Sequence, residues 1–86
     1  MSTQQLPVTF TTLLLSMGSA AILAMGLEPH PETGKTEKDL HLAQFNIEML
    51  KVLQLKTKNN LDADEQRFLN SLISDLQLKF VSATKN

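Results

Sequence analysis

The sequence predicts an all-α protein of three helices that assembles as a helical homo-oligomer. Three segments place apolar residues at helical spacing, two breaks rich in Gly, Pro or Asn separate them, and no strand-like alternation of useful length is present. The 86 residues suit a single helical domain, residues 1–86, whose core is small for its surface. Because the chain has no cysteine for disulfides or thiolate metal sites, we expect self-association to complete that core.

The first helix is expected over residues 8–25, starting close to the proline at position 7, which a first helical turn tolerates. Gly26 is expected to end this helix in the left-handed conformation, with Leu27 folding back on Ile22. Two prolines in the next segment cannot continue a helix, so residues 26–35 are predicted to form an ordered turn or loop.

The second helix is predicted over residues 37–58. The Thr36 hydroxyl is expected to cap its free amides, with Asp39 in the reciprocal position of a capping box. Asn59 and Asn60 are expected to end the helix, one of them in the left-handed conformation that Asn tolerates best after Gly.

The third helix is predicted over residues 63–82, with Asp62 as its N-cap and Glu65 in the reciprocal position of a capping box. Residues 83–86 are expected to fray. At 100° per residue its apolar side chains share one face, which needs one partner surface. These residues are Phe68, Leu69, Leu72, Ile73, Leu76 and Phe80.

The second helix carries two opposed apolar faces, and a polar strip that includes Glu48 runs between them. One face contains Leu40, Ala43, Ile47 and Leu50. The other contains Leu42, Phe45, Met49, Val52 and Leu53. A helix with two apolar faces must be covered twice, and three helices in one monomer cannot cover every face. The second face is therefore a candidate for contact with another copy.

The first helix also exceeds what one monomer can cover, because its apolar residues point in several directions. It carries a row of small residues at four-residue spacing, which lets another helix approach closely. That row faces either a second copy or a bulky neighbour within the monomer. The predicted self-association residues on both helices are Leu13, Ser16, Ala20, Ala24, Leu42, Phe45, Met49 and Val52.

Charge is unevenly placed, since no charged side chain occurs before Glu28. A secretory signal is not expected, because its positively charged start is missing. Membrane attachment through the first helix is the alternative to burial in protein, but hydroxyl and glycine residues dilute that segment and no basic residue flanks it before Lys35. The net charge of -1 and the lack of Trp and Tyr argue against a nucleic-acid partner.

We expect neither catalysis nor a cofactor or bound metal. The only histidines, His30 and His41, have no further ligand at metal-site spacing. Two lysines at the end of the second helix, Lys56 and Lys58, are explained by the helix dipole. A lesser alternative is a small-ligand pocket near the Pro-rich loop, with His30, Glu32 and these lysines in polar roles.

The loop Gly26-Leu27-Glu28-Pro29-His30-Pro31-Glu32-Thr33-Gly34 and the stretch Leu53-Gln54-Leu55-Lys56-Thr57-Lys58-Asn59-Asn60-Leu61 resemble the bacterial domain-of-unknown-function family eighteen forty-four. The resemblance runs from about Phe10 to Val81. Asn59 stands where the family usually has Gly, and Glu48 where Asp is usual. The resemblance implies a short helical cytoplasmic protein without an assigned activity. A non-catalytic, self-associating interaction module is the function we expect.

Overall fold

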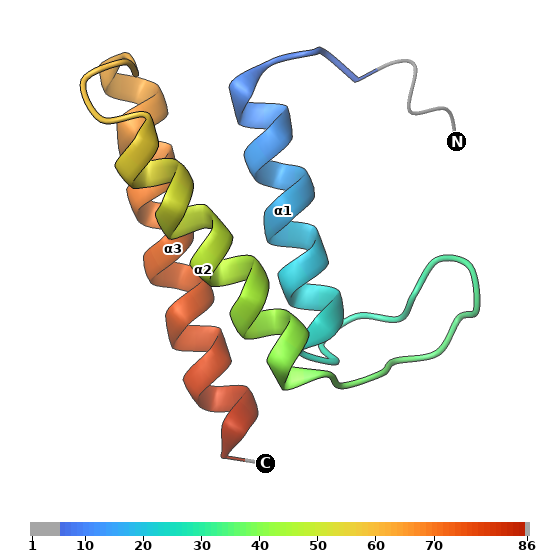
Figure 1. Ribbon diagram of the computed structural model, residues 1–86. Helices are drawn as coiled ribbons and strands as arrows, with labels where there is room; N and C mark the ends of the chain where they lie inside the picture. Colours follow the sequence, from blue (N-terminus) through green and yellow to red (C-terminus); the bar gives the residue numbers. More distant parts are fainter. Residues whose placement is uncertain (1–5, 86) are drawn as a thin grey trace.

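The computed structural model describes residues 6–85 and confirms the prediction of a three-helix, all-α chain. Helix α1 spans Phe10–Ala24, α2 spans Leu40–Lys56 and α3 spans Ala63–Thr84. The described residues form no strand, apart from one isolated β-bridge. Helices α2 and α3 form an antiparallel hairpin, and α1 packs against both (Figure 1).

Both ends of α1 follow from local sequence. Its N-cap is Thr9, whose hydroxyl accepts a hydrogen bond of 3.1 Å from an amide of the first turn. At the other end Gly26 has a φ of 77°. The Gly26 amide donates to the Leu23 carbonyl at 3.0 Å, and the Leu27 amide donates to the Ile22 carbonyl at 3.3 Å. These two bonds form a Schellman motif, as the glycine predicted.

The start of α2 differs from the prediction, because the helix begins three residues later than residue 37. Asp39 is its N-cap, and Thr36 is not. The preceding residues are held extended: Lys38 forms an antiparallel bridge with Met25, and the Asp39 amide donates to the Ala24 carbonyl at 2.7 Å. This pairing with the end of α1 competes with helix formation and delays the first turn of α2.

The turn between α2 and α3 contains the two features that the sequence predicted there. Asn59 has a φ of 69°, in the left-handed region. The Glu65 amide donates to the Asp62 carboxylate at 2.8 Å, and the Asp62 amide donates to the Glu65 carboxylate at 3.1 Å. This reciprocal pair is a complete capping box.

The C-terminal end of α3 is more ordered than predicted, since the helix continues to Thr84. Ala83 was expected to fray, but it is buried. The Lys38 ammonium group donates a hydrogen bond of 3.1 Å to the Ala83 carbonyl. A lysine from the loop before α2 thus satisfies one of the free carbonyls at the end of α3. This contact explains why α3 continues beyond its predicted end at residue 82.

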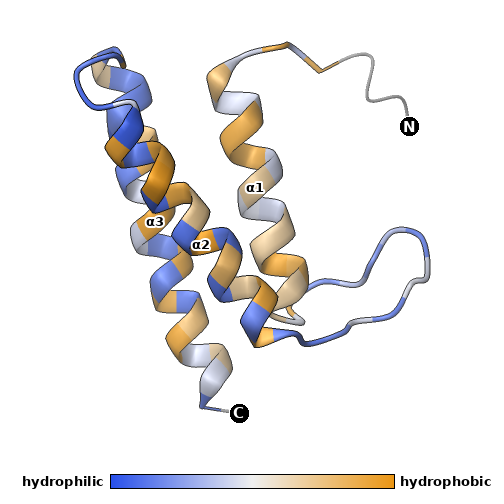
Figure 2. Cartoon of the chain, viewed as in Figure 1, coloured by the Kyte–Doolittle hydropathy of each residue, from blue (hydrophilic) through white to orange (hydrophobic). Residues whose placement is uncertain are grey.

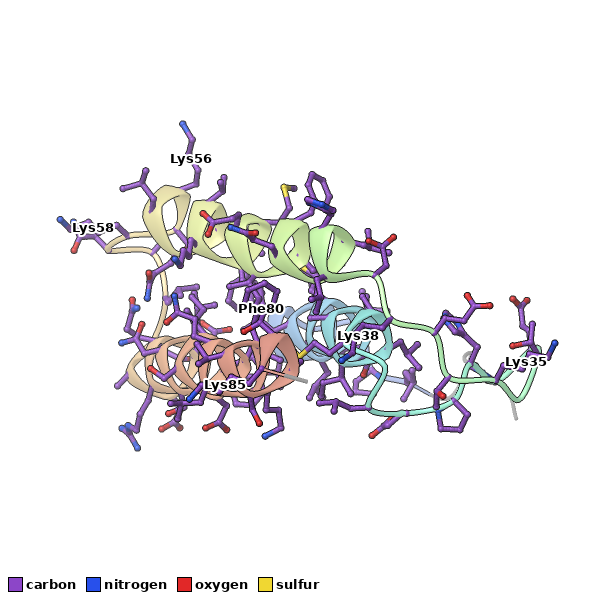
Figure 3. All side chains as sticks on the ribbon, turned by 90° about the horizontal axis from the view of Figure 1, so that it is seen from below. Lys35, Lys38, Lys56, Lys58, Phe80 and Lys85 are labelled. Carbon is purple, nitrogen blue, oxygen red and sulfur yellow. The ribbon has the colours of Figure 1, made fainter. Side chains whose placement is uncertain are left out.

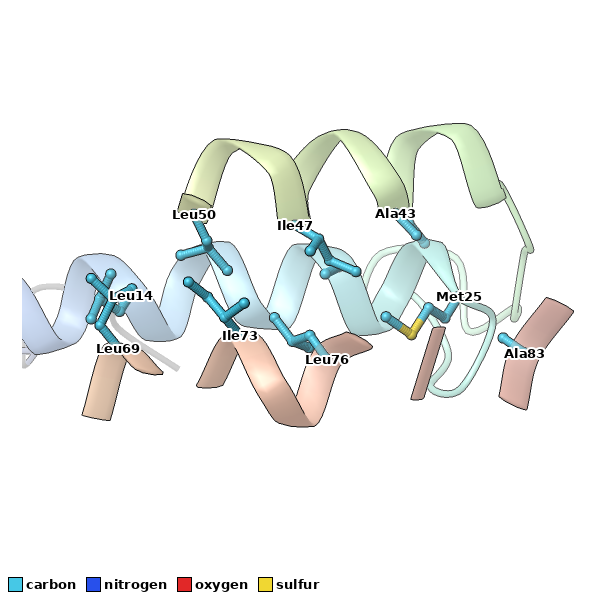
Figure 4. Close-up of a cluster of buried hydrophobic side chains, with 11 residues drawn as sticks. Leu14, Met25, Ala43, Ile47, Leu50, Leu69, Ile73, Leu76 and Ala83 are labelled. Atoms are coloured by element: carbon cyan, nitrogen blue, oxygen red, sulfur yellow. The ribbon is translucent and has the colours of Figure 1, made fainter. Parts of the chain in front are cut away.

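The core lies where the three helices face one another (Figure 4). Helix α1 contributes Leu14, α2 contributes Leu50 and α3 contributes Leu69, all fully buried. Leucine and alanine dominate the cluster, and no polar or charged side chain is buried in the described residues. The buried apolar residues are Leu14, Ala21, Ala24, Met25, Ala43, Ile47, Leu50, Leu69, Ile73, Leu76 and Ala83.

The molecule is thin and open for its mass. It measures 38 × 33 × 16 Å between Cα extremes. Its radius of gyration is 13.6 Å, compared with about 12 Å for a compact domain of this length. Many apolar side chains consequently lie at the surface. Figure 2 shows that α1 carries no strongly hydrophilic residue, whereas hydrophobic and hydrophilic residues alternate along α2 and α3.

Candidate interaction surface

Helix α2 buries one of its two apolar faces within the chain and leaves the other exposed. The buried face centres on Ala43, Ile47 and Leu50. The opposite face forms what we call the exposed stripe, whose side chains keep between 41% and 59% of their surface in solvent. The exposed stripe consists of Leu42, Phe45, Met49 and Val52.

The spacing of the exposed stripe is that of a helix seam. Its members follow one another at intervals of three, four and three residues, which is the a/d pattern of a heptad repeat. This pattern keeps the side chains on one side of α2 over about 15 Å of helix. None of the four is charged, so covering them desolvates no ion.

The exposed stripe points away from α3. The side of α2 that faces α3 includes Gln44, Glu48 and Lys51, which line a depression together with Phe80 of α3. At 100° per residue the centre of the exposed stripe lies about 110° around α2 from that side. In Figure 3 α2 lies above α3, and α1 lies beside both. The four side chains of the exposed stripe remain between 41% and 59% exposed next to these neighbours.

Helix α1 presents a second apolar surface, which we call the α1 groove. It is an open depression of about 610 Å³ on the outward face of α1, extended by the residues that lead into the helix. Its lining consists mainly of serine, threonine, alanine and leucine side chains. The helical part of the groove includes Thr12, Leu15, Ser16, Ser19, Ala20 and Leu23.

Part of the α1 groove lies away from α3. Gly18 of α1 lies against the Leu72 side chain of α3. Ser16 and Ala20 are each two residues from Gly18, and therefore about 160° around α1 from it. They lie on the flank of α1 that is remote from α3. This part of the α1 groove and the exposed stripe of α2 therefore both lie away from α3.

Most of the residues predicted for self-association lie at the surface, but one does not. Leu13 and Ser16 are exposed, and Ala20 is partly exposed. Ala24 is 4% exposed and belongs to the core. Residues four apart advance by about 40° around a helix, so the small-residue row winds from the outward face at Ser16 to the buried face at Ala24.

Sequence reasoning missed several residues of the α1 groove, namely Thr12, Leu15, Ser19 and Leu23. The sequence nevertheless contains a feature that points to these residues, namely the absence of charge. All of α1 precedes the first charged side chain of the sequence, so even its outward face carries no charge. A solvated helix surface normally carries charged and polar residues, and their absence on an outward face marks a candidate contact surface.

The residues considered for ligand chemistry do not come together. His30 and Glu32 belong to the loop before α2, whereas Lys56 and Lys58 lie at the other end of that helix (Figure 3). A depression beside Lys58 is lined otherwise by Gln54, Leu55, Asn59 and Gln66, without a histidine or carboxylate. Within residues 6–85, no three side chains of the metal-ligating types converge.

The length of α1 bears on the alternative of a membrane span through the first helix. Helix α1 is 15 residues long, shorter than the roughly 20 residues that cross a bilayer. In the part of the chain that the structure describes, none of the helices combines the length and apolar character needed to cross a membrane.

Comparisons with known proteins identify the family. Neither the curated proteins nor the solved structures contain a match to this chain. Among protein families, the one described as "Domain of unknown function (DUF1844)" matches residues 7–82. That match covers all three helices and agrees with the resemblance carried by the Pro-rich loop and the end of α2. The chain therefore belongs to the DUF1844 family of domains of unknown function.

Proposed function

We propose that this protein is a non-catalytic, self-associating helical module whose interface includes the exposed stripe of α2. The observation that carries the proposal is the heptad spacing of four large, uncharged side chains on a face that no other helix of the chain covers. Scattered apolar residues are ordinary on protein surfaces, but a continuous apolar seam along a helix is typical of an interface.

The surface area of the chain supports the same proposal. The chain exposes 6247 Å², whereas a folded monomer of 9.6 kDa exposes about 5,100 Å². Part of the excess comes from the loop at residues 27–39, where every residue except His30 is exposed. The excess of about 1,100 Å² is of the size that a stable interface removes, since each partner in a standard interface buries about 800 Å².

The test is the molar mass of the purified protein in detergent-free buffer, measured by light scattering after size exclusion over a range of concentrations. We expect a stable multiple of the 9.6 kDa chain. The substitution Phe45→Glu places a charge in the centre of the exposed stripe, and we expect it to yield monomers.

A matched control is available on α3. Leu78 is 72% exposed and lies on the side of α3 away from the core, so Leu78→Glu makes the same chemical change on an exposed helix face outside the stripe. This variant is expected to keep the molar mass of the wild-type protein. A wild-type protein that is monomeric at every concentration would refute the proposed function.

A further inference from the structure

The exposed stripe and the α1 groove are complementary surfaces on one chain. We propose that two copies form a two-fold dimer in which the exposed stripe of each copy packs into the α1 groove of the other. This inference rests on the proposed function, because it assumes that the chain self-associates. It adds the partner surface and the symmetry of the contact.

Size is the first reason for this pairing. The exposed stripe consists of only four side chains, each partly covered within its own chain, so it is smaller than the roughly 800 Å² that each partner contributes to a standard interface. A contact of stripe with stripe would leave the α1 groove open to solvent. Reciprocal packing of stripe into groove covers both surfaces of both copies at once.

Shape is the second reason. The exposed stripe runs from Leu42 to Val52, about 15 Å along α2. The helical part of the α1 groove runs from Thr12 to Leu23, about 16 Å along α1. Bulky side chains, including Phe45 and Met49, would meet a lining in which serine, threonine and alanine outnumber leucine. Large residues packing over small ones allow close approach between helices.

Charge is the third reason. No Lys, Arg, Asp or Glu occurs in the exposed stripe or anywhere in α1. A heterologous partner recognised by charge would find no ionic contact on either surface. A second copy offers two uncharged surfaces of matching length, and their contact leaves no charge without a partner.

In the proposed dimer the two-fold axis runs parallel to the helices, on the side of the molecule away from α3. Such an axis places α2 of one copy opposite α1 of the other, and it keeps each residue at its own height along the bundle. Figure 4 places Leu50 on the Leu14 side of the core and Ala43 on the Met25 side. Because the two helices run antiparallel, Ser16 in the groove lies within about one helical turn of the height of Met49 in the stripe.

A mixing experiment tests the reciprocal contact. Met49→Lys places a positive charge in the stripe, and Ser16→Glu places a negative charge in the groove; both sites are exposed. Each variant alone is expected to form a weaker dimer, whose dissociation constant is at least tenfold higher than that of the wild-type protein. An equimolar mixture is expected to return to twice the chain mass. In the heterodimer one contact pairs lysine with glutamate, and the other contact is wild-type on both sides.

The control mixture combines Ser16→Glu with Met49→Glu, which makes the same contacts with like charges and should stay monomeric. Circular dichroism of each variant, recorded before mixing, verifies that it is folded. If stripe packs on stripe, Ser16→Glu lies outside the contact and keeps the wild-type mass alone. If the two positions do not meet across the contact, the mixture of the Lys and Glu variants does not return to twice the chain mass. That result, or a wild-type mass for Ser16→Glu alone, overturns this inference while the proposed function stands. A monomeric wild-type protein overturns both.

Discussion

The two apolar faces of α2 are both free of charged side chains, but they have opposite surroundings. One face packs Ala43, Ile47 and Leu50 between α1 and α3, whereas the other exposes Phe45 and Met49 to solvent. Hydrophobicity alone does not distinguish them. The difference shows that the fold of the single chain uses half of the apolar surface of α2, and that the other half is available for a partner.

The sharpest way to separate the two faces is to truncate one leucine of the buried face. Leu50 is fully buried, and we expect Leu50→Ala to reduce the free energy of unfolding by about 2–5 kcal/mol, because it removes apolar contacts and leaves a cavity. A domain of this length has about 4–13 kcal/mol in total. Urea denaturation monitored by circular dichroism measures the loss.

The control for Leu50→Ala is Val52→Ala on the exposed stripe, compared at a protein concentration low enough for monomers. Val52 is 48% exposed, so its truncation should lower the free energy of unfolding of the monomer by less than about 1 kcal/mol. Equal losses for the two variants would mean that the buried and exposed faces are not distinct in solution.

The second prediction concerns the exposed face. If folding is linked to dimer formation, a hundredfold dilution should lower the stability of each chain by about 1.4 kcal/mol, or roughly 5–10 °C in Tm. Thermal unfolding at two concentrations measures the shift. In Phe45→Glu the Tm should be the same at both concentrations. A wild-type Tm that does not change with protein concentration would contradict the proposed role of the exposed stripe in dimer formation.

The parts of the fold that the sequence predicted correctly are those controlled by neighbouring residues. Gly26 ends α1, and Asp62 with Glu65 starts α3, because each motif is satisfied within a few positions. The start of α2 depends instead on Lys38, whose backbone pairs with Met25 and whose ammonium group reaches Ala83, 45 residues away. No pattern of neighbouring residues in the sequence predicts contacts between residues this far apart.

The candidate surface could be predicted only in part for a related reason. Helical periodicity identified two apolar faces on α2, but it could not show which of them the monomer buries. The small-residue row on α1 was extended to Ala24 by its regular spacing, yet the row turns into the core at that point. The α1 groove depends on where α2 and α3 pack, and that arrangement is tertiary information.

The third prediction tests what both faces of α2 share, namely the start of the helix. Asp39→Ala removes the carboxylate that accepts the Leu42 amide at 3.1 Å, and it should lower the free energy of unfolding by about 1 kcal/mol. Thr36→Ala is the matched control and should be neutral, because Thr36 does not cap the helix. Denaturant titration of both variants distinguishes the observed cap from the one that the sequence favoured.

The smallest effect is expected from the polar strip that separates the two faces of α2. Its Lys51 ammonium group lies 3.4 Å from the Glu48 carboxylate, and the two side chains are 40% and 55% exposed. Solvent screens such a pair, so Glu48→Gln should change the free energy of unfolding by less than about 0.5 kcal/mol. The molar mass should also be unchanged, because Glu48 lines the depression between α2 and α3 and is not a member of the exposed stripe. Light scattering of this variant therefore locates the edge of the interface. If the variant no longer assembles, the interface extends across the polar strip toward α3. If its molar mass is unchanged, the interface is confined to the side of α2 that carries Phe45 and Met49.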